Sequence, residues 1–307
     1  MKLADLDLKS LAVFRAVADQ GGFAGASSTL HMSQSAISFH ISGLEKRLGF
    51  RVCRRGRGGF ELTDRGAIAY ERVKSLLASV DDFDSEMGGL RDTLVGTLRL
   101  GIVDNTITDD SMPYPQILGE FLRRNAGVDL DVSIESPEYL VTHVANGQLH
   151  LALVPETNRI QGLQYHPVHQ ERHSVYCAAQ HPLFDVDQEQ LSLDTVAAHP
   201  FVAHRYADRR EQRIFDGVQV GAEVSNMEAQ AMLILSGRFI GYLPDHYARR
   251  WCEQNSLCPI LPASTGMVSS FYIVTRAGKR ASLVVRSFIQ ELVAHSSKMA
   301  HEGVMTR

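Results

Sequence analysis

The sequence predicts an α/β protein with a small helical module at its N-terminus, one long helix and a larger α/β body. Residues 1–65 hold ten lysines and arginines against six aspartates and glutamates, a net charge of +4, although the whole 307-residue chain has a net charge of −4. Residues 66 to about 90 carry a single apolar stripe of helical spacing, and from Val95 onward short apolar runs alternate with helical patterns. A basic module joined to a body of net charge −8 indicates that the two parts bind different partners.

Three short helices are predicted before residue 50. Residues 8–19 carry the apolar stripe of a first helix, and residues 23–30 form a second helix too short to be stable unless it packs. Ser33 precedes the third helix and is a good N-cap, because its hydroxyl can accept a free amide of the first turn. The apolar residues of the third helix recur on one face: Ala36, Ile37, Ile41, Leu44 and Leu48. Two short helices joined by so tight a turn are typical of a helix-turn-helix.

The opposite face of the third helix carries mostly small, uncharged hydrogen-bonding groups. Such groups suit base edges in the major groove of double-stranded DNA better than they suit phosphate alone. The candidate DNA-binding residues of this helix and its cap are Ser33, Gln34, Ser35, Ser38, Phe39 and His40.

A basic hairpin is predicted directly after the third helix, in the segment RVCRRGRGGFELTDRG. Two short strands flank a Gly- and Arg-rich turn at residues 56–59. The hairpin holds Arg54, Arg55 and Arg57, whose charges can lie along a phosphate backbone. Scattered arginines also occur in ordinary helical domains, but a basic hairpin after a capped helix favours a winged helix-turn-helix DNA-binding domain over residues 1–65.

Thr63 is expected to cap a long helix that runs to about residue 90. Its stripe is close to a heptad repeat and comprises Tyr70, Val73, Leu77, Val80, Phe83, Met87 and Leu90. A single stripe on so long a helix requires a partner, and the same helix of a second copy is favoured over packing against its own body. Residues 66–94 are therefore interpreted as a linker and dimerisation helix with a hinge.

The rest of the chain predicts an α/β sandwich with largely parallel sheets. Strands are expected at residues 98–103, 130–134, 149–154, 175–178, 239–243 and 271–275. Helices are expected at residues 115–124, 139–146, 227–235, 245–253 and 283–295. The body is thus expected to span residues 95–295, followed by a tail at 296–307.

Ligands of open α/β sheets bind beyond the carboxyl ends of strands, near helix N-termini. That rule selects five candidate effector contacts: Asn105, Thr106, Ser136, Arg205 and Asn226. Each of them can also be a helix cap or a loop residue with an internal partner. Arg205 suits a carboxylate because a guanidinium binds two oxygens at once, but a salt bridge to acidic residues nearby in the sequence remains open.

The N-terminal motifs resemble those of the LysR-type transcriptional regulators. The resemblance lies in GGF before the second helix, LHMSQSAIS at the turn, LEKRLG at the end of the third helix and LTDRG after the hairpin, and it extends more weakly over the rest of the chain. It implies an effector-binding domain like type 2 periplasmic binding proteins, with subdomain I at about 95–165 and 268–295 and subdomain II at about 166–267. Most family members carry an arginine where this chain has Phe39, which is expected either to touch a thymine methyl or to pack beside the wing.

The resemblance also implies partners and regulation. A dimer, associating further into a tetramer, is expected to bind an inverted-repeat promoter site under the control of a small organic anion. RNA polymerase is a further expected partner. Neither the effector, the operator sequence nor the sign of regulation follows from the sequence.

Three other classes of protein are weighed against this interpretation. The chain has no G-x-S-x-G motif, Walker loop or strand-associated GxGxxG, so neither an enzyme nor a cofactor is expected. A solute-binding protein fits the body, but the basic module and the lack of an export signal count against it. No apolar run is long enough for a membrane span, and four cysteines without a signal peptide favour the cytoplasm.

Two side-chain series are considered and set aside. Cys252 and Cys258 can be compared with the cysteine pairs of redox-sensing relatives in the family, but core packing is favoured. A second series has steps of three, four and four residues, as in a metal site on a helix: His166, His169, His173 and Cys177. The segment contains a proline, β-branched residues and a strand-like tail, and strand geometry would place these side chains on both faces, so no metal is expected.

Overall fold

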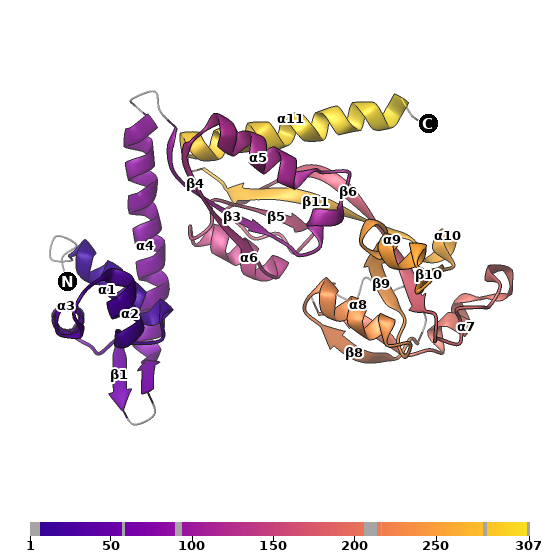
Figure 1. The fold of residues 1–307 in the computed structure, drawn as a ribbon, viewed down its shortest axis with the longest axis horizontal. Helices are drawn as coiled ribbons and strands as arrows, with labels where there is room; N and C mark the ends of the chain where they lie inside the picture. The colour runs from indigo at the N-terminus through magenta and orange to yellow at the C-terminus, as the bar shows by residue number, and fades with distance from the viewer. Residues whose placement is uncertain are drawn as a thin grey trace. The chain divides into compact units, whose positions relative to one another are not determined.

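A computed structural model describes residues 7–56, 59–89, 94–205, 214–215, 217–278 and 281–305. The side chains of residues 55, 56, 89 and 297–305 lie outside this description. The chain forms two compact units, residues 1–90 and 91–307 (Figure 1). Each unit has its own hydrophobic core.

The N-terminal unit consists of three short helices, a hairpin and a long helix. They are α1 (Leu8–Asp19), α2 (Phe23–Leu30), α3 (Gln34–Leu48), β1 (Cys53–Gly56), β2 (Gly59–Leu62) and α4 (Asp64–Gly89). All four helices contribute to one core, in which Phe14, Ile37 and Leu44 are fully buried. The predicted helix-turn-helix and hairpin are confirmed.

Local capping signals fix where the helices begin and end. The Oγ of Ser33 accepts a hydrogen bond of 3.2 Å from the amide of Ala36, and α3 ends at Gly49, which has a left-handed φ of 79°. The Oγ1 of Thr63 accepts a hydrogen bond of 2.9 Å from the amide of Gly66 in the first turn of α4. Both predicted caps are confirmed.

The apolar stripe of α4 divides into two parts. Val73 and Leu77 are buried in the core of their own unit. Farther along the helix, Phe83 is 57% exposed and Met87 is 42% exposed. Packing against its own unit therefore accounts for the first part of the stripe only, and the last expected member, Leu90, lies outside the described residues.

The C-terminal unit is built on a seven-stranded mixed sheet. Its strands are β3 (Val95–Ile102), β4 (Gly127–Ile134), β5 (Leu151–Pro155), β6 (Leu163–Ala178), β9 (Gly241–Pro244), β10 (Leu257–Ile260) and β11 (Met267–Arg276). The order is β10-β6-β11-β5-β3-β4, and β9 also pairs with β6. Only β3 pairs in parallel, with β4 and β5, whereas β6 and β11 are antiparallel to all their partners. The prediction of largely parallel sheets is wrong for this sheet, because β6 and β11 run side by side in opposite directions.

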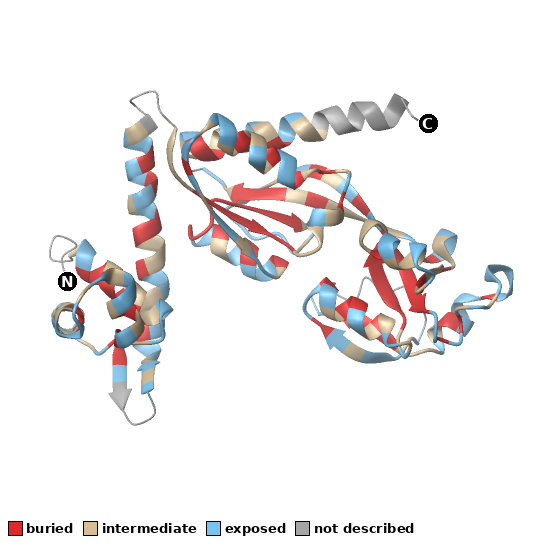
Figure 2. Ribbon diagram, in the orientation of Figure 1, coloured by how far each residue is buried: buried red, intermediate tan, exposed pale blue. Residues whose placement is uncertain are grey.

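Strands β6 and β11 pass from one subdomain to the other (Figure 1). In subdomain I, α5 (Tyr114–Arg124) and α11 (Leu283–Met305) cover one face of the sheet and α6 (Pro137–Ala145) covers the other. Subdomain II adds a parallel pair, β7 (Phe201–His204) and β8 (Val220–Val224). Its helices are α7 (Leu193–Ala197), α8 (Met227–Leu235), α9 (Asp245–Glu253) and α10 (Pro262–Thr265). Buried residues form separate cores in the two subdomains (Figure 2).

Several elements differ from the sequence-based prediction. Strands β7, β8 and β10 and helices α7 and α10 were not predicted. Only the last four residues of β6 were predicted, although the strand has 16 residues. Its first part carries histidines, glutamines and a glutamate, so a search for apolar runs finds only its buried end. The expected tail at 296–307 is helical as far as Met305.

Candidate functional site

The outer face of α3 presents the candidate base contacts to solvent. Gln34, Ser35 and Phe39 are exposed, and Phe39 is the most open of the three at 77%. Its ring makes an edge contact with the ring of His40, at a centroid distance of 6.0 Å. The exposed ring of Phe39 therefore does not pack beside the wing, and the aromatic surface of Phe39 is open to a partner.

The other predicted residues of α3 already have partners within the unit. Ser33 caps the helix, and its Oγ lies 2.9 Å from the Oγ of Ser35. The Oγ of Ser38 donates to the carbonyl of Gln34 at 2.7 Å. The Nδ1 of His40 is 3.0 Å from the Oγ of Ser10, so this ring is directed toward α1.

The hairpin places its first arginine on the surface. Arg54 is exposed on β1, opposite Glu61 on β2. The backbone of Arg55 lies in β1, but its side chain and all of Arg57 are outside the described residues.

A cavity of about 230 Å³ lies between the two subdomains of the C-terminal unit. Val103 and Val141 of subdomain I and Met227 of subdomain II form part of its apolar wall. Among the described residues, its lining includes three glutamates, Glu138, Glu156 and Glu171, and neither lysine nor arginine. The polar lining also includes Asn105 and His173.

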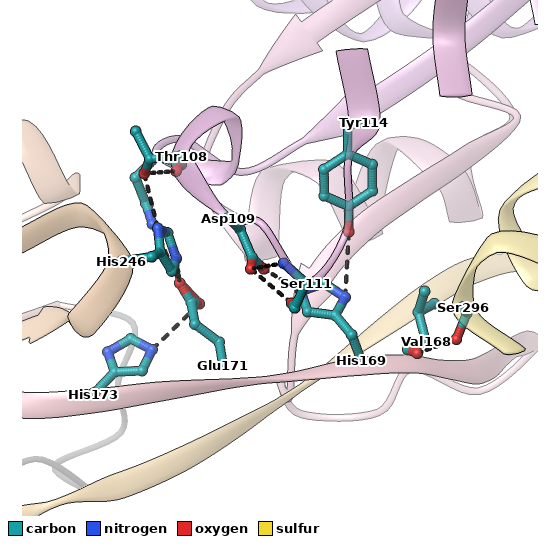
Figure 3. Close-up of polar contacts among 11 residues, drawn as sticks. Thr108, Asp109, Ser111, Tyr114, Val168, His169, Glu171, His173, His246 and Ser296 are labelled. Carbon is teal, nitrogen blue, oxygen red and sulfur yellow. Dashed lines mark hydrogen bonds and ion pairs between the residues drawn. The ribbon is translucent and has the colours of Figure 1, made fainter. Parts of the chain in front are cut away.

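A buried polar network surrounds Glu171, in the middle of β6 (Figure 3). Its Oε1 accepts hydrogen bonds from the Nε2 of His246 at 2.6 Å and from the Nδ2 of Asn105 at 3.4 Å. The Nε2 of His173 lies 3.3 Å from the Oε2. The Nδ1 of His246 in turn lies 2.8 Å from the Oγ1 of Thr108. This network joins subdomain I, through Asn105 and Thr108, to α9 of subdomain II.

Glu171 remains ionised in this setting. Burial acts to raise its pKa, but hydrogen bonds and positive charge from His173 and His246 outweigh burial and lower the pKa to about 2. Such a carboxylate keeps its negative charge at any physiological pH.

A second polar pair lies beside the network. The Nε2 of His169 is 3.0 Å from the Oδ2 of Asp109, and its ring stacks on Phe271. Because side chains alternate along a strand, His169, Glu171 and His173 share one face of β6. Within the described residues, no group of three or more histidine, cysteine or acidic side chains could hold a metal ion.

The N-termini of the helices beside the cavity are capped from within the protein. At α8, the Oδ2 of Asp104 accepts from the amide of Met227 at 2.6 Å, and Asn226 accepts from the amide of Ala229 at 2.8 Å. At α6, the Oγ of Ser136 accepts from the amide of Tyr139 at 3.4 Å.

The five predicted effector residues therefore have different positions. Asn105 lines the cavity. Ser136 and Asn226 are helix caps next to it, Thr106 begins a short 3₁₀ helix (Thr106–Thr108), and Arg205 is exposed after β7. The acidic residues considered as alternative salt-bridge partners of Arg205 are outside the described residues.

Sequence reasoning missed the two most central residues, Glu171 and His173. It searched the ends of strands, whereas these side chains lie inside a strand that passes between the subdomains. The spacing of His169, Glu171 and His173 by two residues was the signal that could have placed them on one face.

The four cysteines are free thiols, and Cys258 lies next to Cys177 of the neighbouring strand. The Sγ of Cys258 lies 3.5 Å from the Sγ of Cys177, across the pairing of β10 with β6. Among the helices of the described residues, none has the length and apolar character needed to cross a membrane.

Comparisons with known proteins match both units. Residues 8–67 match the model of the bacterial regulatory helix-turn-helix protein, lysR family, and residues 91–297 match the LysR substrate binding domain. The HTH-type transcriptional activator BauR of Pseudomonas aeruginosa is 36% identical over 294 residues, covering 94% of this chain and 95% of its own. The SDS degradation transcriptional activation protein of a Pseudomonas species is 27% identical over 290 residues, covering 90% and 92%.

Solved structures share the fold of the whole chain. Full-length CbnR in complex with its target DNA has a TM-score of 0.68 at 19% identity, and the match covers 96% of this chain and 100% of that one.

Proposed function

The chain belongs to the LysR family of transcriptional regulators, and from this premise we propose that a pair of chains binds an inverted-repeat DNA site under the control of a small molecule. The observation that carries the DNA-binding part is the open face of α3, presented by a capped helix directly before a basic hairpin. Both relatives described above are transcriptional activators rather than enzymes.

In this proposal α3 enters the major groove. Gln34, Ser35 and Ser38 face base edges, while Ser33 caps the helix and His40 contacts Ser10 of α1. Phe39 contacts a thymine methyl, which is apolar and accessible in that groove. Arg54, together with Arg55 and Arg57, contacts phosphate and fixes the orientation of the unit on DNA.

Dimerisation is proposed through the second part of the α4 stripe. Phe83 and Met87 are exposed apolar residues on a long helix, and a second copy of that helix would cover them. Two-fold symmetry then places two winged units on the two halves of an inverted repeat. We extend the proposal to a tetramer that bends DNA, with RNA polymerase as the downstream partner, in keeping with the named activity of the two relatives.

The cavity between the subdomains is the proposed effector site. It is lined by both subdomains, so a ligand bound there can favour one arrangement of them over another. Asn105 is the proposed direct contact, while Thr106, Ser136, Arg205 and Asn226 are proposed to border the site.

The test is a fluorescence-anisotropy titration of the full chain against promoter DNA, with scrambled DNA as the reference. The wild-type chain should prefer an inverted repeat. Gln34→Ala should lower the affinity for the preferred site by about 1–3 kcal/mol and leave binding to scrambled DNA almost unchanged. Gln20→Ala, the same change on the exposed end of α1, is the matched control and should have no effect. Equal affinity of the wild-type chain for both DNAs would refute the proposal.

A further inference from the structure

The charge of the cavity lining points to the chemical class of the effector. Glu138, Glu156 and Glu171 line the cavity, and the described part of the lining contains no lysine or arginine. His246, which approaches from α9, is already hydrogen-bonded to Glu171. A cleft lined by charges of one sign attracts ligands of the opposite sign and repels those of the same sign.

The two helices that begin beside the cavity offer little to an anion. Anions bind at helix N-termini because the first amides of a helix lack partners. At α8, carboxylate and amide oxygens of Asp104 and Asn226 already occupy the amides of Met227 and Ala229. At α6, Pro137 has no amide hydrogen, Ser136 occupies the amide of Tyr139, and Glu138 adds a negative charge to the first turn.

The innermost polar wall of the cavity presents hydrogen-bond acceptors. Asn105 donates its Nδ2 to Glu171, so its Oδ1 is left to accept. An ionised carboxylate has about four acceptor positions, and three donors face Glu171: His246, Asn105 and His173.

His173 lies beside Glu171 in the same wall. It is only 5% exposed, its Nε2 lies 3.3 Å from the Oε2 of Glu171, and its Nδ1 is buried with no hydrogen-bond partner within the described residues. A buried ring nitrogen without a partner in the cavity wall calls for a polar group from the ligand.

We propose that the effector carries a primary ammonium group, which donates hydrogen bonds to Glu171 and Asn105. The proposal rests on the proposed function only in taking this cavity as the effector site. An ammonium group supplies three donors and one positive charge, matching the acceptors and the sign of the lining. The hydroxyls of Thr142, Thr157 and Ser269 donate or accept equally well and do not discriminate.

The remainder of the effector is small and apolar next to the ammonium group. The cavity of about 230 Å³ is smaller than the roughly 300–1,000 Å³ of sites for drug-sized ligands. Met267, Val268 and Phe271 give it apolar surface along β11. A short alkyl amine therefore fits better than the organic anion that the family resemblance implied.

The test uses four-carbon probes that differ only in their charged groups. Butylamine, 1,4-diaminobutane, butyrate and succinate are titrated into the full chain by calorimetry, with thermal unfolding as a second readout. The two amines should bind and raise the melting temperature, and the two carboxylates should do neither. Binding of a carboxylate without binding of an amine would overturn the proposal, and so would the absence of amine binding at millimolar concentration.

Variants locate the ammonium group. Glu171→Gln keeps the shape of the side chain and removes its charge, so amine affinity should fall by about tenfold or more. Because Glu171 is buried, Glu138→Gln at the exposed rim is the second variant, with an expected fall of about two- to fivefold. Glu135→Gln, which changes an exposed glutamate outside the lining, is the matched control and should bind amines like the wild type.

The variant results separate this inference from the proposed function. Equal amine affinity in Glu138→Gln, Glu171→Gln and Glu135→Gln would overturn the ammonium assignment. DNA affinity without any ligand is measured on the same samples. A wild-type chain that binds amines but shows no preference for its DNA site would contradict the proposed function and leave the ammonium assignment standing.

Discussion

Gly66 is predicted to be indispensable to the N-terminal unit, because the first turn of α4 passes directly against the backbone of Val52. A Cβ on residue 66 would lie 1.8 Å from the carbonyl oxygen of Val52 and 2.7 Å from its carbonyl carbon. Favourable contacts between carbon atoms are about 3.5–4.0 Å. Val52 is fully buried, and its carbonyl accepts a hydrogen bond of 3.1 Å from the amide of Thr63. Gly66→Ala therefore requires movement of backbone rather than of a flexible side chain.

The expected loss of folding free energy in Gly66→Ala follows from two opposing effects. Overpacking costs about 1–3 kcal/mol, and a clash with backbone belongs at or beyond the upper end of that range. The higher helix propensity of alanine offsets about 1 kcal/mol. Gly66→Ala should thus destabilise the N-terminal unit by about 2 kcal/mol or more.

Gly43→Ala is the matched control, because it introduces the same methyl group inside α3 of the same unit. No heavy atom lies within 4 Å of the added Cβ, apart from the helix backbone and adjacent residues. Here the gain in helix propensity has no opposing clash, so the unit should become more stable by about 0.5–1 kcal/mol.

Hydrogen exchange measured by mass spectrometry on the full chain distinguishes the two variants. Peptides from α1 and α3 should exchange about 30-fold faster or more in Gly66→Ala and about two- to fivefold slower in Gly43→Ala, where exchange proceeds through unfolding of the unit. Peptides from the C-terminal unit serve as an internal reference. Wild-type exchange rates in Gly66→Ala would refute the reasoning from the contact with Val52.

Three further predictions concern DNA binding, assembly and pH. Arg54→Ala should reduce the slope of log affinity for DNA against log salt concentration by about 0.9 for each lost phosphate contact. Arg123→Ala, on the exposed face of α5, should leave the slope as in the wild type. An unchanged slope in Arg54→Ala would exclude a phosphate contact of Arg54. Phe83→Asp should shift sedimentation of the chain from the dimer toward the monomer. Ile68→Asp, at an exposed position of α4 off the apolar stripe, should not. Equal dissociation of the dimer in the two variants would contradict dimerisation through the stripe. Burial, together with the charge of His173, lowers the pKa of His204 to about 3, so the unfolded chain binds the extra proton first as the pH falls. The contribution of His204 to the stability of the C-terminal unit should therefore be full above about pH 6.5 and lower by about 2 kcal/mol near pH 5. A melting temperature of His204→Gln that falls as steeply as that of the wild type between about pH 7 and about pH 5 would exclude His204 as a cause of the loss.

The N-terminal unit was predictable because its signals are local. Ser33 and Thr63 satisfy amides three residues away, and a sequence window of that length contains both partners. Helix α9 was predicted with its observed bounds (Asp245–Glu253) for the same reason, since its apolar spacing and flanking proline are short-range features. Strand β6 was not predictable in full, because its polar first part is stabilised by pairing with β11, about a hundred residues later.

The candidate site was predictable only where it follows a strand end. The rule of the carboxyl ends placed Asn105 on the cavity wall, because its position depends on β3 and the loop directly after it. Glu171 and His173 become part of a cavity only when β6 passes between subdomains and His246 approaches from α9. No local pattern encodes such a meeting of residues 75 positions apart.

The network around Glu171 also indicates how an effector can act at a distance from DNA. Asn105 of subdomain I and His246 of subdomain II donate to the same carboxylate oxygen, so their simultaneous contact requires one relative arrangement of the subdomains. A ligand that binds Glu171 only in that arrangement stabilises it by its difference in affinity for the two arrangements, typically about 1–3 kcal/mol. A ligand that binds equally well after His246 has moved away does not shift the equilibrium between the two arrangements, however tightly it binds. Regulation therefore depends on whether the ligand requires Asn105 and His246 in place, and amine affinity measured in His246→Gln reports that dependence directly.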